Sequence, residues 1–325
     1  MRAFQHFSMP GFKPLGYLFL IAVGIALTGC GASRLSLQPE IKSARPSLAD
    51  PRMHSMQSAA LADQPTHRLP AMTGEEYERM GDALLVRRDM HAAYLHYEKA
   101  LQIDPGNIRL EYKKGLTLLK AGQSDEAARQ FQTVLGKNPE YAPAHEGLGR
   151  TFLLQNKVET AKTHFNQALA LDDRLWRAHN YLGTIYDREK QWEKAAAAYQ
   201  AAIDLQPRHG EIYNNLGMSY LLAGKYASAV EAFHNALTHG FAHTKTYNNL
   251  GVALASLGHH EAAFEAFKKA GGEPRAYNNL GCIYMKEGRF DKAVTSFEKA
   301  IAMEPAYYVK ASENLKRAKA AHKEL

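Results

Sequence analysis

Five histidines form the group of side chains in this sequence with the greatest capacity for chemistry. They lie in one stretch of the chain and are His234, His239, His243, His259 and His260. Imidazole binds transition metals and transfers protons near neutral pH. However, His239 and His243 lie on either side of Gly240, so helical spacing of the two rings is not assured, and no Cys or carboxylate completes a recognisable zinc set. We therefore expect histidines in solvated turns and no metal site.

Sequence motifs of catalysis are also missing from the 325 residues. There is no Gly-rich phosphate loop, no Gly-x-Ser-x-Gly elbow and no His-Glu-x-x-His pair. The formal net charge is +7, but the basic residues are interspersed with acidic ones and no nucleic-acid-binding motif accompanies them. A hydrophobic fraction of 46% predicts a folded chain. We expect no enzymatic activity, no cofactor, no small-molecule substrate and no nucleic-acid partner.

The N-terminal residues predict a lipid anchor at Cys30. The run Leu15–Leu27 is apolar, follows Lys13, and is shorter than the roughly 20 residues that a membrane-spanning helix needs. It ends in Leu27-Thr28-Gly29-Cys30, which resembles the lipobox of bacterial lipoproteins. The resemblance implies that residues 1–29 are a signal peptide and that the thiol of Cys30 is acylated after the signal peptide is recognised. Several acyl chains would then hold the protein stably on a membrane.

The residue after the cysteine indicates which membrane would hold the lipidated protein. Asp at that position favours inner-membrane retention by the sorting rule of enteric bacteria, and the residue here is Gly31. The expected location is therefore the periplasmic face of the outer membrane. The alternatives are an uncleaved short anchor and an ordinary secretory signal with a chance cysteine. The start of translation is either Met1 or Met9.

Residues 30–73 predict the lipidated cysteine followed by a flexible tether. Five prolines interrupt this segment without a sustained apolar period: Pro39, Pro46, Pro51, Pro65 and Pro70. Such a composition is typical of a linker rather than a domain. It is either a leash that lets the folded part reach away from the membrane or a spacer of no specific consequence.

A repeat of 34 residues fills the rest of the chain. Its most regular member is a glycine, present as Gly81, Gly115, Gly149, Gly183, Gly217, Gly251 and, after only 30 residues, Gly281. Each period carries two apolar stripes, which in one period are Tyr213, Leu216, Gly217 and Tyr220, and then Ala229, Phe233 and Ala236. Both stripes have helical spacing, and a turn at Gly224-Lys225 separates them. Because Gly217 and Ala229 are small, the two helices can approach closely.

This pattern resembles the tetratricopeptide repeat (TPR), whose period is 34 residues. The resemblance implies an all-α TPR solenoid, a right-handed superhelix of antiparallel helix pairs. Seven repeats would occupy residues 74–307, and the polar segment 308–325 would be a capping helix for the open end of the stack. One helix pair cannot bury its own apolar faces, but a stack of seven can.

Two repeats depart from the pattern. Repeat two has Glu111 and Lys114 where the family prefers aromatic and aliphatic residues, so we expect it to be the least well packed. The stretch Ala270–Tyr277 is four residues shorter than its counterpart in repeat four. We expect the second helix of repeat six to end at Gly271-Gly272, with Pro274 opening the next helix. This shortening either kinks the array or is a tolerated change in a surface connection.

The first helix of each repeat supplies the candidate binding surface, since in this family it lines the concave face. The same position carries Asn215, Asn249 and Asn279 in three repeats. An amide offers donors and an acceptor to the backbone of an extended peptide. Basic side chains lie one turn earlier on first helices, namely Arg177, Lys245 and Arg275, and are suited to acidic side chains or a C-terminus. The alternative is that asparagine here is family consensus and merely solvated.

The combination of lipobox, tether and repeats resembles TadD-like lipoproteins of tight-adherence (Flp) pilus assembly, and most of all in the run 270–281 with its shortened repeat. The resemblance implies a periplasmic scaffold whose partners are proteins, such as a secretin or other pilus and secretion components. The alternatives are a type IV pilotin, an adaptor for cell-wall enzymes, and an accessory subunit of a polysaccharide synthesis or export complex.

Overall fold

The computed structural model describes residues 72–303 and 308–323. Within these ranges every regular element is a helix, which confirms the all-α prediction. None of the described helices combines the length and the apolar character needed to cross a lipid bilayer. The predicted signal peptide, Cys30 and nearly all of the predicted tether lie outside the described residues, so these predictions stay predictions.

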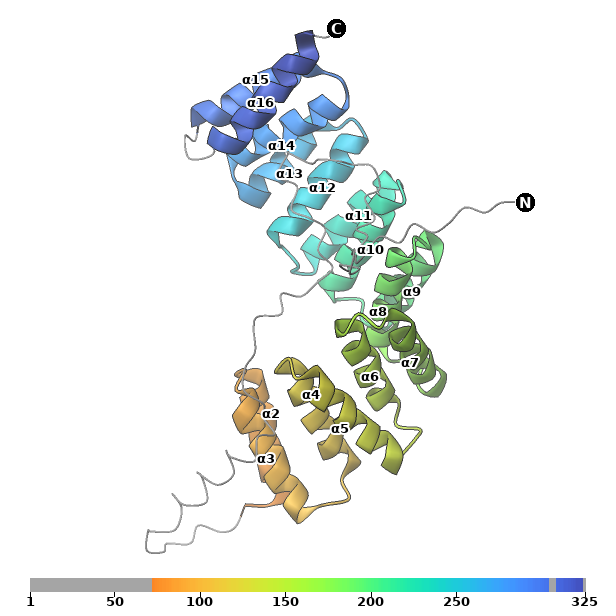
Figure 1. Ribbon diagram of the computed structural model, residues 1–325. Helices are drawn as coiled ribbons and strands as arrows, with labels where there is room; N and C mark the ends of the chain where they lie inside the picture. The colour runs from red at the N-terminus through yellow and green to blue at the C-terminus, as the bar shows by residue number, and fades with distance from the viewer. Residues whose placement is uncertain (1–71, 304–307, 324–325) are drawn as a thin grey trace, which may run out of the picture.

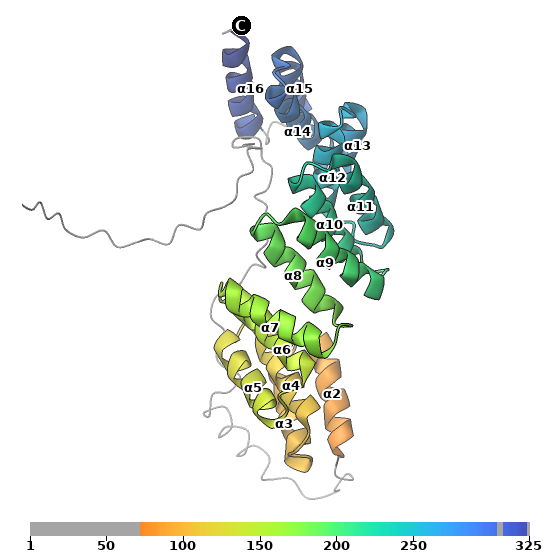
Figure 2. The same ribbon diagram turned by 90° about the vertical axis from the view of Figure 1, so that its right-hand side faces the viewer.

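The helices follow one another along the chain as an elongated stack, with α2 at one end and α16 at the other (Figures 1 and 2). Their bounds are α2 Gly74–Val86, α3 Met90–Ile103, α4 Ile108–Lys120, α5 Ser124–Lys137, α6 Ala142–Leu154, α7 Val158–Leu171, α8 Trp176–Arg188, α9 Trp192–Leu205, α10 Gly210–Leu222, α11 Tyr226–Thr238, α12 Thr244–Ser256, α13 His260–Gly271, α14 Glu273–Lys286, α15 Phe290–Met303 and α16 Tyr308–Lys323. Helices α2 to α15 form seven pairs, one for each repeat, and α16 packs on α15. This is the solenoid of antiparallel helix pairs that the sequence predicts.

Within each pair, the repeat glycine lies against an aromatic ring of the second helix. A Cβ atom added to Gly217 would lie 2.8 Å from the ring of Phe233. The same contact recurs in the other repeats as Gly81–Tyr97, Gly115–Phe131, Gly149–Phe165, Gly183–Tyr199, Gly251–Phe267 and Gly281–Phe297. A side chain at the glycine would clash with the ring, because interiors are already close-packed. The expected close approach of the two helices is therefore present in all seven pairs.

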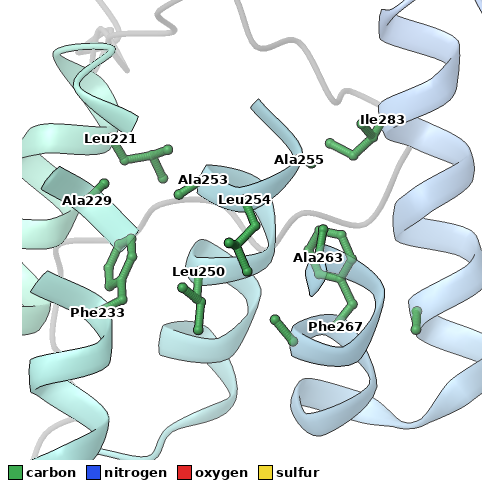
Figure 3. Close-up of a cluster of buried hydrophobic side chains, with 12 residues drawn as sticks. Leu221, Ala229, Phe233, Leu250, Ala253, Leu254, Ala255, Ala263, Phe267 and Ile283 are labelled. Carbon is green, nitrogen blue, oxygen red and sulfur yellow. The ribbon is translucent and has the colours of Figure 1, made fainter. Parts of the chain in front are cut away.

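Between repeats, the same ring packs on the first helix of the next pair. Figure 3 shows Phe233 of α11 facing Leu250 and Leu254 of α12, with Phe267 of α13 on the other side of α12. Successive first helices also touch one another directly, as α4–α6, α6–α8, α8–α10 and α10–α12 do. The first helices thus form one layer, here called the inner layer, and the second helices pack over it.

The shortened repeat has the expected ends. Helix α13 stops at Gly271, Gly272 takes a left-handed conformation with φ 84°, and α14 begins at Glu273 with Pro274 in its first turn. Proline fits there because the first N–H groups of a helix have no intrahelical partner. A single residue therefore connects the two helices, and the prediction is confirmed.

The capping helix is also present. In α16, Ala311 and Ala318 are fully buried against the last repeat, and Lys319 forms a 2.8 Å ion pair with Glu298 of α15. The remaining face of the helix carries exposed charged residues. This arrangement lets the stack end without an apolar face in water.

In repeat two, ion pairs replace apolar contacts. Lys114 is mostly covered and lies 3.2 Å from Glu98, with its ammonium 4.8 Å from the centre of the Tyr94 ring. Glu111 pairs with Lys137 at 2.9 Å. The two residues therefore occupy the positions expected from the repeat, and each has a charged partner. Reduced stability of this repeat stays a prediction.

Candidate functional site

All six residues predicted to bind a partner lie in the inner layer. Asn215, Asn249 and Asn279 are half-buried at the same position of α10, α12 and α14, and we call this set the amide ladder. The basic residues one turn earlier are exposed: Arg177, Lys245 and Arg275. The helical repeat brings each set into one register along the array, as the sequence predicts.

The structure gives each ladder amide a partner that the sequence analysis missed. Asn215 donates from Nδ2 to Oδ1 of Asn180 in the preceding repeat, at 3.1 Å. Asn279 donates in the same way to Asn248, at 3.3 Å. Asn249 donates to the Met218 sulfur at 2.7 Å. Each bond joins neighbouring repeats and uses one of the two amide hydrogens.

Two of these three bonds, those from Asn215 and Asn279, end at one position of the first helices. This position lies three residues before the repeat glycine and is Tyr112 in repeat two; in the other six repeats it is polar, as Glu78, Glu146, Asn180, Asn214, Asn248 and Asn278. Asn214 accepts a 3.0 Å hydrogen bond from Thr246 of the next repeat. Asn278, fully buried, accepts one from Asn314 of the capping helix at 3.1 Å. From α8 through α10, α12 and α14 to α16, polar side chains are thus hydrogen-bonded from one helix to the next along the inner layer.

At the N-terminal end of the array the same connection is ionic. Lys113 stands at the ladder position of repeat two and lies 2.7 Å from Glu78 and 2.7 Å from Asp82, both in repeat one. Arg109 also contacts Glu78 at 2.7 Å, yet its own side chain remains 62% exposed. Arg109 shares its place in the repeat with Arg177 and Lys245. The positions of the asparagines do not indicate Arg109, but its spacing from Gly115, which equals that of Arg177 from Gly183, does.

Glu146 is the most deeply buried acidic residue that the structure describes in this layer, with 4% of the residue exposed. Its side chain lies 3.6 Å from Arg150, one turn along α6. Burial raises the pKa of Glu146, and the nearby guanidinium groups of Arg150 and Arg177 oppose that rise. Arg177 itself extends over the ring of Trp176, 4.4 Å from its centre. The basic side chain predicted to bind a partner is therefore held by an aromatic ring and lies near a buried carboxylate.

The histidines do not gather. His239 stacks on Tyr213, with ring centres 5.1 Å apart, and His243 lies edge-on to Phe241. His260 is not in a solvated turn as expected, because it begins α13 and is largely covered, 2.8 Å from Glu287. Within residues 72–303 and 308–323, no three His, Cys, Asp or Glu side chains are grouped as metal ligands. Cys282 is a buried core residue.

Comparison with known proteins identifies the repeat. Sequence profiles described as "Tetratricopeptide repeat" match residues 112–174, 155–210, 182–243 and 214–277, and another of the same description matches 274–307. Superkiller complex protein 3 of Homo sapiens is 31% identical over 81 residues, which are 25% of this chain and 5% of that protein. Tetratricopeptide repeat protein 37 of Xenopus laevis is 33% identical over an equally long stretch. The chain thus matches about a twentieth of the length of these curated relatives.

Solved structures show the same fold. The chain in the crystal structure of the APC/C hetero-tetramer Cut9-Hcn1 superposes with a TM-score of 0.53 at 19% identity, over 77% of this chain and 49% of that one. The pilF protein of Pseudomonas aeruginosa superposes with a TM-score of 0.51 at 22% identity, over 67% of this chain and 98% of that one. The repeat profiles together span residues 112–307, more than half of the chain. The chain therefore belongs to the tetratricopeptide-repeat family and has the architecture of a protein-interaction scaffold.

Proposed function

We propose that this chain is a lipid-anchored scaffold on the periplasmic face of the outer membrane, where it holds another protein during assembly of a tight-adherence (Flp) pilus or secretion apparatus. The lipobox-like sequence ending at Cys30 supports the anchor. The resemblance of lipobox, tether and shortened repeat to TadD-like lipoproteins supports the assembly system. No catalytic role is part of this proposal.

One observation supports the inner layer as the binding surface. Basic side chains stand at a single position of four first helices, as Arg109, Arg177, Lys245 and Arg275. All four are exposed on the inner layer, so they can meet a partner that runs along it. Glu211 takes this position in repeat five and divides the row into two basic groups. The favoured ligand is an extended protein segment with acidic side chains, which would also reach the half-buried amide ladder.

Site-specific photo-cross-linking in cells tests the surface. A photoreactive residue replaces Lys245 of the inner layer in one variant and Lys269, an exposed residue of the second helix α13, in the control. We expect cross-links to a pilus or secretion component from position 245 and not from position 269. Identical products from both positions would contradict binding along the inner layer.

The identity of the captured protein tests the assembly system separately. A secretin or another component of a Flp pilus apparatus would support the proposal. Capture of a glycosyltransferase would favour the alternative of a polysaccharide complex. Charge reversal of Lys245 to Glu should weaken binding by about tenfold at low salt, and less at high salt, because exposed charges are screened. The same reversal at Lys269 should leave the affinity unchanged.

A further inference from the structure

One repeat carries an acidic residue inside its apolar core. The position four residues after the repeat glycine is apolar in six repeats: Leu85, Leu119, Leu153, Leu221, Ala255 and Met285. In repeat four it is Asp187, whose side chain is nonetheless buried, with 5% of the residue exposed. A buried carboxylate is costly unless its oxygens are hydrogen-bonded or paired with a charge.

The surroundings of Asp187 satisfy this requirement only in part. The Tyr199 hydroxyl of α9 donates to Oδ2 at 2.9 Å, whereas Oδ1 is buried without a hydrogen-bond partner. Ser219 of α10 faces the same carboxyl, but its buried Oγ is outside hydrogen-bonding geometry. Asp187 is also the penultimate residue of α8, where the negative end of the helix dipole opposes a negative side chain.

Burial raises the pKa of Asp187 to about 6, and the hydroxyls of Ser219 and Tyr199 only partly offset this. Neighbouring elements place other charged or titratable groups on α8, namely Arg150 of α6, Lys162 of α7, Lys194 of α9 and His209 before α10. The end of α8 itself adds Arg188 and Glu189. Lys162 is engaged with Glu189 at 2.7 Å. Burial sets this pKa, and the two groups that oppose its effect, the hydroxyls of Ser219 and Tyr199, are both uncharged.

We propose that the junction between repeats four and five is a pH-sensitive joint of the array, loosened by the ionised Asp187 side chain and tightened when that side chain takes up a proton. The three groups involved come from α8, α9 and α10, so they span the contact between the two repeats. On the same junction, the bond from Asn215 to Asn180 joins the inner layer. Protonation removes the negative charge, so the buried and unpartnered Oδ1 no longer carries the cost of an uncompensated carboxylate.

The direction of the effect follows from the two pKa values. The carboxyl titrates near 6 in the folded chain and near its ordinary value of 3.8 when unfolded. Between these values the folded state binds more protons, so the junction becomes more stable as the pH falls from about 7 towards 4. Between pH 7.5 and 5 the equilibrium constant for opening should fall by about tenfold. Most aspartates in proteins have the opposite effect, because their pKa is lowered on folding.

The protein contains a local reporter for this junction. Its two tryptophans, Trp176 and Trp192, begin the two helices of repeat four, and Trp176 contacts His209 of repeat five with ring centres 4.6 Å apart. Tryptophan fluorescence of the full chain during urea unfolding therefore follows this region, while far-UV circular dichroism follows all helices. When the pH is lowered from 7.5 to 5, we expect the urea midpoint followed by fluorescence to rise by more than the midpoint followed by circular dichroism.

Substitutions at position 187 decide whether the carboxyl is responsible. Asp187→Asn and Asp187→Leu both remove the carboxyl, and leucine is the residue at the equivalent positions 153 and 221. In both variants the fluorescence midpoint and the dichroism midpoint should shift by the same amount between pH 7.5 and 5. His209→Gln removes the ring that contacts Trp176, so it controls for direct effects of that ring on the fluorescence, and it should retain the parental shift. Persistence of the full pH response in both variants at position 187 would overturn the proposal.

A further variant keeps the carboxyl and changes its environment. Tyr199→Phe removes the donor to Oδ2 and places here the residue that repeats two, three, five, six and seven already have. The pH at which the junction tightens should move upward, because the ionised form loses its hydrogen bond. An unchanged or lowered transition pH would contradict the role of Asp187, even if the position-187 variants did not fold.

Discussion

The side-chain amide of Asn215 donates a 3.1 Å hydrogen bond to the amide oxygen of Asn180, which lies one repeat earlier. This bond gives the amide ladder a structural role. From the sequence, the asparagines could be ligands for a peptide or solvated consensus residues. In the structure they connect first helices to each other, so they contribute to the inner layer before any partner binds.

Asn215→Ala should therefore lower the free energy of unfolding by about 0.5–1.5 kcal/mol, the usual net contribution of one hydrogen bond. Asn166 on α7 is exposed, so Asn166→Ala is a matched control expected to change stability by less than about 0.5 kcal/mol. Urea unfolding followed by circular dichroism measures both. Equal stability of the two variants would show that the bond to Asn180 contributes nothing.

The fold could be predicted from the sequence because every repeat has a glycine and an aromatic residue at equivalent positions. Seven glycines at equivalent positions predicted seven close helix contacts, and all seven meet an aromatic ring. The end of α13 was predictable for a similar reason, since Gly272 and Pro274 restrict the backbone locally. Local signals of this kind do not depend on where distant residues lie.

The candidate site was predictable only in part. Register along the repeats placed Lys245 and Arg275 on one layer, as the structure shows. The partner of Asn215 is 35 residues away, and its distance depends on how two repeats rotate against each other. The same holds for Asp187, whose burial depends on Tyr199 and on α10. Contacts of this kind are set by the stacking geometry, which spacing alone does not specify.

Cys30→Ala tests the anchor, which lies outside the described residues. If the thiol is the site of acylation, the variant should no longer be processed between positions 29 and 30 by the lipoprotein route and should lose its lipid-dependent membrane association. Labelling of cells with a fatty-acid analogue, followed by fractionation, measures both properties. Processing at the same bond together with unchanged membrane binding would refute the lipoprotein prediction. Ser33→Ala, three residues further on, is the control and should behave as the parent.

Gly217→Ala tests the close packing within a helix pair. The added Cβ would lie 2.8 Å from the Phe233 ring, so the helices must separate or the ring must move. Overpacking of this kind costs about 1–3 kcal/mol. Gly136, also inside a helix, has nothing within 4 Å of an added Cβ, so Gly136→Ala should be stabilising by up to about 1 kcal/mol because alanine favours helix. Thermal unfolding should show opposite signs for the two substitutions, and a gain in stability for Gly217→Ala would contradict the packing described.

The turns inside the helix pairs offer a last test, because one residue in each has a left-handed backbone. Four of these residues are glycine and three are not: Gly122, Gly224, Gly258 and Gly288, and Arg88, Asn156 and Lys190. The left-handed conformation costs a residue with a Cβ about 1–2 kcal/mol, and glycine loses part of that advantage through its greater freedom when unfolded. Lys190 has φ 59° and its exposed side chain makes no contribution to the core. Lys190→Gly should therefore stabilise the chain by about 0.5–1 kcal/mol, and Gly224→Lys, at the equivalent turn with φ 75°, should destabilise it by a similar amount. Melting temperatures of the two variants should move in opposite directions from that of the parent. A loss of stability in Lys190→Gly would mean that the lysine has a favourable interaction that outweighs the strain of its backbone.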